Sequence, residues 1–431
     1  MSQDAKPRFH YFLRAIATFI ALSLFLGGCS KEPSSQSISF VVRTGLESEG
    51  LKKVAQEYTK KTGVKVEAFE LGRDGYLSAV PSQLVARAAT FDVAFIPSTM
   101  VAELASGKAI LALDNYVNTR DPDLIATYGY QGQTFALPTD LSTMFLYYRK
   151  DLIAEPPQTW QEVLDLAKRF SKATNPASPT QYGLAFPGMS GEELPKAFYS
   201  VLWSFGGFIS DGTHVGIGNK ESIAAAEFYR RLVEEKVVPQ DVTSWGFAQI
   251  YENLENGKLA MAAPFWNAAA SLLLNSKGKY GDKIAWTLVP GVRVDGGNIQ
   301  RVPFQHAWTL AVSATSKNPK AAAEFVAFAT GKEGGQIYAQ AVSGNPARYS
   351  LLEAPELRKA RPEFDLLLKS LKIARPEPET PKYAAMHDVM NEALTKVLTG
   401  NQTATQAMEQ AGDKLSKLGL GTLKTTITQP K

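Results

Sequence analysis

The chain has 431 residues, of which 45% are hydrophobic and 20% charged, with a formal net charge of +4 at pH 7 and a single cysteine. This composition is typical of a folded protein of two or three domains, and it excludes a disordered chain or a disulfide-rich peptide scaffold. One cysteine cannot form an intramolecular disulfide or a Cys-rich metal site, and the slight charge gives no argument for nucleic-acid binding.

The first 30 residues have the pattern of an export signal. Three basic residues precede an uncharged apolar run at 15–26. Twelve helical residues rise only about 18 Å, short of the roughly 30 Å hydrocarbon core, so the run predicts a signal peptide and not a membrane span. The run ends in Leu26-Gly-Gly-Cys29, which resembles the bacterial lipobox, where the cysteine is diacylated and becomes the first residue after cleavage. We therefore expect a lipoprotein signal peptide at 1–28 and a flexible tether at 29–37; the alternative is an ordinary secretory signal that contains a cysteine.

The folded part is expected to begin near residue 38. The pattern predicts a buried strand over 38–42 and a strand with one exposed face over 64–69. Between them, apolar residues recur at helical spacing from Leu51 to Tyr58, and a third strand is expected over 91–96. This β-α-β opening predicts a parallel sheet covered by helices.

A second series of elements follows residue 156. Thr159 and Glu162 form a capping-box pattern, which predicts that a helix begins there. Asn318-Pro319 predicts another helix start, because proline is tolerated at the first helical position. Further helices are expected at 222–235 and 247–255, further strands at 259–262 and 284–288, and a mostly helical chain after residue 346.

Motifs of enzyme chemistry are missing from the sequence. It has no phosphate-binding P-loop, zinc-protease, serine-hydrolase or calcium-loop motif. The adjacent tyrosines Tyr147 and Tyr148 could ligate ferric ion, but alternation along a strand would turn them to opposite faces. We therefore expect a protein that is not an enzyme and has no cofactor or metal.

Several short segments stand in a characteristic order along nearly the whole chain: 62–66, 91–95, 136–140, 146–152, 156–160, 256–261, 264–266, 317–321 and 344–348. With them, residues 38–398 resemble a family 1 extracellular solute-binding protein, one of the maltose-binding-like substrate receptors of ABC importers. The chain departs from many relatives at 305–308, where Gln-His-Ala-Trp stands in place of Gly-Gly.

The resemblance implies an α/β, two-lobed periplasmic-binding-protein fold of type II, with the ligand in a cleft between lobes joined by hinge strands. Lobe one would comprise 38–140 plus 288–345, and lobe two 141–287 plus 346–431. Such receptors close around a solute by hinge motion and deliver it to ABC permease subunits. The protein would be exported and lipid-anchored through Cys29 on the periplasmic or extracellular face of a bacterial membrane.

Candidate aromatic residues for the cleft follow from the chemistry of sugars, whose C–H faces stack on rings. Trp266 stands where relatives place an aromatic side chain on the ligand. Trp203, Trp245 and Trp308 are further candidate platforms, and His306 lies beside Trp308. For each tryptophan the alternative is packing in the core.

Candidate polar residues would bind the hydroxyl groups of a sugar. Asp140 follows a Leu-Pro turn and is expected to be exposed at the crossing between the lobes, with turn capping as its alternative. Ser142 aligns roughly with a carboxylate that contacts sugar in maltose-binding relatives. Ser98 follows a strand end, where α/β sheets place ligands, although helix capping is an alternative. Glu47 in the first loop and Arg348 complete the set; Arg348 would grip the ligand or pair across the lobes.

Two hypotheses of function remain from the sequence. The first is a receptor that captures a sugar or oligosaccharide for an ABC importer. The alternative is the same receptor fold with a charged solute, such as a polyamine, a glycerophosphodiester or an organic acid. A lipid-anchored hydrolase would need a nucleophile with a positioned base, for which the sequence offers no motif.

Overall fold

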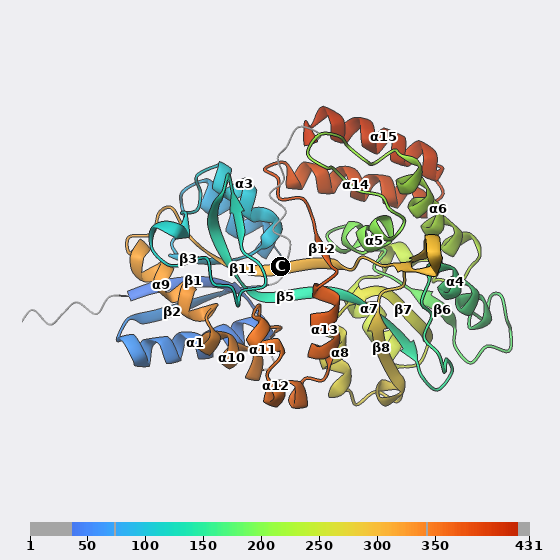
Figure 1. The fold of residues 1–431 in the computed structure, drawn as a ribbon, viewed down its shortest axis with the longest axis horizontal. Helices are drawn as coiled ribbons and strands as arrows, with labels where there is room; N and C mark the ends of the chain where they lie inside the picture. The colour runs from blue at the N-terminus through green and yellow to red at the C-terminus, as the bar shows by residue number, and fades with distance from the viewer. Residues whose placement is uncertain (1–36, 73–74, 342–343, 421–431) are drawn as a thin grey trace, which may run out of the picture.

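The computed structural model describes residues 37–72, 75–341 and 344–420. The predicted leader, Cys29 and nearly all of the tether lie outside these residues. Two lobes of mixed α/β structure lie side by side, and long strands run from one to the other (Figure 1).

Lobe one is a sheet covered by helices, and its opening elements are close to those predicted. β1 pairs in parallel with β2 on one side and with β3 on the other. The four apolar positions predicted for the first helix are all buried, and Gly63 ends that helix in the left-handed conformation with φ 73°. The elements of lobe one are β1 (Ser37–Arg43), α1 (Leu46–Thr62), β2 (Lys65–Leu71), α2 (Tyr76–Val85), β3 (Val93–Pro97), α3 (Val101–Ser106), β4 (Tyr128–Tyr130), α9 (Pro319–Ala329), α10 (Lys332–Gln340), α11 (Tyr349–Leu352) and α12 (Pro355–Ala360).

Lobe two contains most of the middle of the chain and its C-terminal helices. Its first helix begins with the predicted capping box: the Glu162 amide donates to Thr159 Oγ1 at 3.2 Å, and the Thr159 amide donates to Glu162 Oε2 at 3.3 Å. The elements of lobe two are α4 (Trp160–Arg169), β6 (Tyr182–Ala185), α5 (Glu193–Ser204), α6 (Lys220–Glu234), α7 (Phe247–Glu255), β7 (Leu259–Trp266), α8 (Ala268–Leu274), β8 (Ile284–Leu288), β9 (Val292–Arg293), β10 (Ile299–Gln300), α14 (Tyr383–Leu398) and α15 (Ala404–Lys417).

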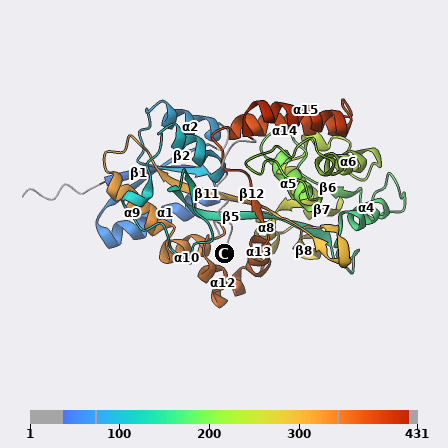
Figure 2. The ribbon, with the colours of Figure 1, turned by 45° about the horizontal axis from the view of Figure 1, so that its top comes forward.

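Three segments connect the lobes: β5 (Gln133–Arg149), β11 (Phe304–Val312) and the chain that leads from α13 (Glu363–Leu371) through β12 (Arg375–Pro376) to α14. β5 and β11 run antiparallel and side by side (Figure 2). Their register shifts between Trp308 and Thr309, where Pro138 lies opposite Thr309. A proline has no N–H for the ladder, so a local irregularity accommodates it.

Two predictions differ from the structure. The sheet is mixed and not parallel throughout, because β11 pairs antiparallel with both β3 and β5. The predicted lobe boundary after residue 345 does not follow the contacts of α11, whose first residues are bonded to Asp123 of lobe one: the Tyr349 amide donates to the Asp123 carbonyl at 3.0 Å, and the Ser350 amide donates to Asp123 Oδ1 at 2.8 Å. The helices after residue 346 are therefore divided between the lobes.

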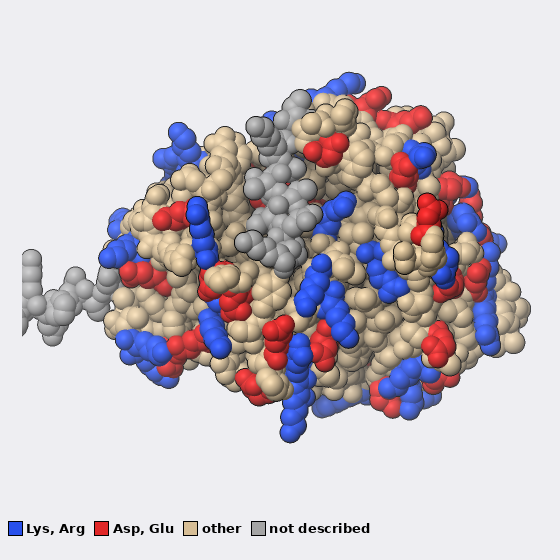
Figure 3. Space-filling view, in the orientation of Figure 1, with Lys and Arg blue, Asp and Glu red and all other residues tan. Residues whose placement is uncertain are grey.

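The described surface carries charges of both signs. Lys and Arg alternate with Asp and Glu over the face in Figure 3. Among the helices of the described ranges, none is long and apolar enough to cross a membrane.

Candidate functional site: a cavity between the lobes

A cavity of about 300 Å³ lies between the lobes, within the size range of roughly 300 to 1,000 Å³ that is usual for small-molecule pockets. Lobe one contributes the end of β1 and the start of α1, the hinge contributes β5 and β11, and lobe two contributes α5, α7, α8 and the end of β7. Six of the ten predicted ligand-binding residues line it: Glu47, Asp140, Ser142, Trp266, His306 and Trp308.

Asp140 lies within β5 and is only 6% exposed, so the prediction of an exposed turn position is wrong. The strand continues through the Leu-Pro segment where a turn was expected. The Asn345 amide donates to Asp140 Oδ2 at 2.9 Å, and Ser142 Oγ donates to Oδ1 at 3.0 Å. Burial raises the pKa of Asp140 to about 6, because two hydrogen bonds compensate only partly for lost hydration. Its carboxyl can therefore change protonation near neutral pH.

The wall from lobe one is built around Arg43 at the end of β1. Its guanidinium forms an ion pair with Glu47, four residues later at the start of α1. The guanidinium carbon also lies 4.0 Å from the centre of the Trp308 ring, a cation–π contact. Trp308 is stacked on Phe95, with ring centres 4.8 Å apart. The Trp308 ring thus supports Arg43 as well as lining the cavity.

The wall from lobe two contains Glu192, Glu193 and Lys196, none of which the sequence analysis selected. Lys196 is 1% exposed, and its ammonium donates to Glu192 Oε2 at 3.3 Å. Burial works to raise the pKa of Glu192, but the ammonium outweighs it and the pKa lies below its ordinary value. Burial raises the pKa of Glu193 to about 7. The i, i+4 spacing of Glu192 and Lys196 was visible in the sequence, but it is typical of an exposed helix face.

Trp266 and His306 meet at the junction of lobe two and the hinge. The Trp266 ring is partly exposed and makes edge contacts with Phe304 and His306, with ring centres 5.9 and 6.0 Å apart. Burial, with the nearby charges of Lys196 and Arg43, holds the pKa of His306 well below its ordinary value. His306 is therefore neutral near pH 7, and the cavity has a partly exposed aromatic side chain beside an uncharged imidazole.

Four predicted residues lie away from the cavity. Ser98 is buried at the end of β3 and lies within hydrogen-bonding distance of the Ala307 amide, at 3.3 Å. Trp203 is packed in the core of lobe two, where it is stacked on Tyr199 and Phe304. Trp245 makes an edge contact with Tyr182 and lines a separate hollow of about 410 Å³ on lobe two. The alternative of core packing thus describes Trp203.

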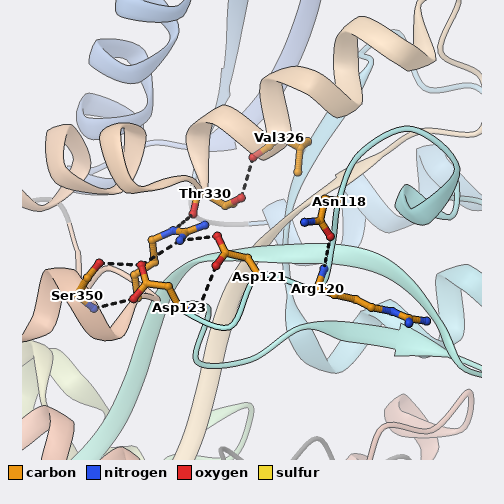
Figure 4. Close-up of polar contacts among 8 residues, drawn as sticks. Asn118, Arg120, Asp121, Asp123, Val326, Thr330 and Ser350 are labelled. Carbon is orange, nitrogen blue, oxygen red and sulfur yellow. Dashed lines mark hydrogen bonds and ion pairs between the residues drawn. The ribbon is translucent and has the colours of Figure 1, made fainter.

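Arg348, the fourth, is 7% exposed and neither lines the cavity nor pairs across the lobes. Its partners Asp121, Asp123 and Thr330, labelled in Figure 4, all belong to lobe one. Nη1 contacts Asp121 Oδ2 at 2.8 Å and Asp123 Oδ2 at 3.0 Å, and Nε donates to the Thr330 carbonyl at 2.7 Å. Hydrogen bonds and charge pairs within one lobe therefore satisfy this guanidinium.

The lining charges largely neutralise one another. Arg43 pairs with Glu47, Lys196 with Glu192, and Arg361 with Glu363 behind the wall. Within residues 37–72, 75–341 and 344–420, no group of three or more His, Cys, Asp or Glu side chains is arranged to hold a metal ion. Charged groups that are already paired can still exchange hydrogen bonds with hydroxyl groups, so the wall suits a neutral polar ligand.

Comparisons with known proteins agree with this architecture. Residues 44–336 match the family described as bacterial extracellular solute-binding protein. A probable amino-acid ABC transporter periplasmic-binding protein of Sinorhizobium fredii is 27% identical over 421 residues, covering 91% of each chain. The galactooligosaccharide-binding protein of Bacillus subtilis is 25% identical, covering 91% of this chain and 94% of its own.

Among solved structures, a maltose-bound protein of T. maritima is similar to this chain with a TM-score of 0.75 and 25% identity. The likeness covers 89% of this chain and 99% of the other.

Proposed function

The chain belongs to the family of bacterial extracellular solute-binding proteins, and from this membership we propose that it captures a small sugar or oligosaccharide for an ABC importer. The solute would enter the cavity between the lobes, the hinge would close around it, and the closed form would deliver it to the permease. The role is binding without bond-breaking.

The observation that carries the proposal is the composition of the cavity wall. Trp266 offers a partly exposed ring, and the wall around it carries the ion pairs Arg43–Glu47 and Lys196–Glu192 beside the carboxyls of Asp140 and Glu193. A sugar presents C–H faces and a rim of hydroxyl groups, which match an aromatic platform and a surrounding set of donors and acceptors. The names of the galactooligosaccharide- and maltose-binding relatives support the same class of ligand.

A charged solute is the second candidate. Both signs of charge line the cavity, and a relative is named as a probable amino-acid binder. A zwitterion or polyamine would compete with the pairs Arg43–Glu47 or Lys196–Glu192, or would bind the carboxyls of Asp140 and Glu193. Burial raises the pKa of both carboxyls and so disfavours their charged forms. Separating a partly buried pair leaves an uncompensated charge, so this observation favours the neutral ligand.

The experiment is thermal unfolding of the chain from Ser30 onward with a panel of mono- and oligosaccharides, polyols, polyamines, amino acids, glycerophosphodiesters and organic acids. A ligand that binds only the folded state stabilises it by about 2.7 kcal/mol at a hundredfold excess over Kd. We expect shifts confined to saccharides and polyols, and recovery of unaltered ligand after incubation. A shift with charged solutes alone would replace the sugar by the second candidate.

We also propose attachment to a membrane through Cys29, which lies outside the described residues. Cys29→Ser should remove the lipid and leave the leader uncleaved, so that the protein no longer partitions into detergent. Ser30→Ala serves as the control and should behave like the wild type. Lipid labelling of the Cys29→Ser variant would contradict the anchor.

A further inference from the structure

One edge of the cavity is an irregular segment at 344–348, between α10 and α11. Gly344 and Asn345 from this segment line the cavity. A segment outside helices and sheets has no ladder of its own, so its backbone groups must find partners elsewhere. The position of this cavity edge therefore depends on contacts with neighbouring parts of lobe one and the hinge.

The cavity end of the segment is bonded to β5. The Asn345 amide donates to Asp140 Oδ2 at 2.9 Å, and the Asn345 carbonyl accepts from the Leu141 amide at 2.9 Å. Arg361 adds hydrogen bonds to the Gly344 carbonyl at 3.3 Å and to Asn345 Oδ1 at 3.2 Å. The Asp140 carboxylate is thus held by the backbone of this segment.

The other end of the segment is held by Arg348. Two aspartates from the loop before β4, Asp121 and Asp123, contact its Nη1 atom. Asp123 also accepts from the Ser350 amide at 2.8 Å and from Ser350 Oγ at 2.7 Å. The Thr330 carbonyl at the end of α9 accepts from Arg348 Nε. One buried guanidinium therefore joins three parts of lobe one.

We propose that Arg348 is a positioning residue of the cleft: its contacts with Asp121 and Asp123 hold segment 344–348 against β5, and so keep the Asn345 amide on Asp140. The effect of this hydrogen bond on ligand capture rests on the proposed function. The positioning of segment 344–348 is a property of the unliganded protein and can be measured without a ligand. An arginine suits the role because its planar fork presents several donors in fixed directions, which a lysine cannot reproduce.

The test uses Arg348→Met, with Asp121→Asn as a milder variant that keeps Arg348 and Asp123. The matched control is Arg358→Met in α12. Arg358 also donates Nε to a backbone carbonyl, that of Leu352 at 2.8 Å, and pairs with an aspartate, Asp365 at 3.0 Å. Within the described ranges Arg358 forms no hydrogen bond or ion pair with segment 344–348, so its variant reports the general effect of losing such an arginine.

The first readout is hydrogen exchange of the Asn345 amide in the unliganded protein. We expect exchange at least about tenfold faster in Arg348→Met, a smaller acceleration in Asp121→Asn, and wild-type exchange in Arg358→Met, because local opening sets the exchange rate.

The second readout is the titration of the Asp140 carboxyl by NMR, assigned with Asp140→Asn. The Asn345 hydrogen bond lowers the pKa of Asp140, so its loss should move the titration to higher pH. Glu47, Arg43, Tyr338 and Arg361 lie near Asp140, and His306, Glu192, Glu193 and Lys196 line the same cavity. None of these groups is substituted in the variants.

If Arg348→Met and Asp121→Asn both showed wild-type exchange of the Asn345 amide and wild-type titration of Asp140, the proposal would be overturned, even if the two variants were less stable. Equal changes in Arg358→Met would overturn it too, because they would reflect general loosening. If Arg348→Met does not fold, the same two measurements on Asp121→Asn test the proposal. No ligand is needed, so a failed sugar panel would leave this result unaffected.

Discussion

The Asp140 carboxyl is a source of instability at the centre of the cleft. Burial raises its pKa from 3.8 to about 6, so the ionised form is disfavoured in the folded protein. Because the folded pKa exceeds the unfolded pKa, the folded state binds the proton more tightly. The contribution of the Asp140 carboxyl to the stability of the folded state is fully present below about pH 4, where the carboxyl is protonated. This contribution is lost as the pH rises to about 6 and the carboxyl ionises. A carboxylate kept at such a position is typical of a functional site.

Asp140→Asn should therefore stabilise the unliganded protein above pH 6, by up to about 3 kcal/mol at 1.36 kcal/mol per pH unit. The gain should shrink as the pH falls from about 6 to about 4, as measured by urea unfolding across this range. Asp151→Asn is the control of opposite sign, because a hydrogen bond from Arg149 lowers the pKa of Asp151. A variant less stable than the wild type at pH 8 would show that the hydrogen bonds of Asp140 outweigh its burial.

The Trp266 ring is the proposed platform for the sugar. Trp266→Ala should weaken binding of any saccharide found by the panel at least about tenfold, since stacking contributes about 0.5 to 1.5 kcal/mol beyond area burial. Isothermal titration calorimetry measures the change. Trp286 in β8 is also partly buried in lobe two but does not line the cavity, so Trp286→Ala is the matched control. Unchanged affinity in Trp266→Ala would remove the ring from the site.

At the scale of elements, segment 344–348 tolerates no added bulk at Gly344. A Cβ atom there would lie 1.9 Å from Asp140 Oδ2 and 2.6 Å from the Tyr338 ring. Gly344→Ala should therefore displace the segment or the carboxylate and weaken saccharide binding at least about tenfold. Gly72→Ala is the control, because nothing lies within 4 Å of its Cβ position. Calorimetry of both variants decides, and wild-type affinity in Gly344→Ala would mean that this edge does not shape the site.

The elements show what could be predicted from the sequence. Local patterns placed α1, α4 and α7 well, because a buried stripe and a capping box depend on neighbouring residues alone. The course of β5 was not predicted: Pro138 argues for a turn, and only pairing with a shifted register in β11 lets the strand continue. That misreading also made Asp140 seem exposed.

The cleft wall from lobe two shows a second limit of the sequence. Glu192 and Lys196 have the spacing of a surface ion pair, yet Lys196 is buried in the wall of the cavity while Glu192 stays partly exposed. Trp203, predicted to stack on the ligand, is instead packed in the core against Phe304. The sequence around it, with Gly206 and Gly207 nearby, is compatible with either position. Membership of a site between lobes depends on tertiary contacts that no local pattern encodes.

At the scale of the whole molecule, the three connections between the lobes are where we expect a hinge motion. β5, β11 and the segment through β12 cross side by side near the cavity, where small changes in backbone angles can rotate one lobe against the other. Arg43 with Glu47 on lobe one and Glu192 with Lys196 on lobe two face the same cavity. A ligand that bonds to both walls favours the closed arrangement by its extra contacts there.

Saturating saccharide should therefore reduce the radius of gyration measured by small-angle X-ray scattering. At the same ligand concentration, Trp266→Ala should keep the radius of gyration of the unliganded protein, because its affinity is lower. At a proportionally higher ligand concentration its radius of gyration should fall as in the wild type. Because calorimetry reports binding and scattering reports shape, the two steps can be separated. A ligand that binds with full occupancy and leaves the scattering unchanged would contradict hinge closure, since the lobes would then hold the solute without moving.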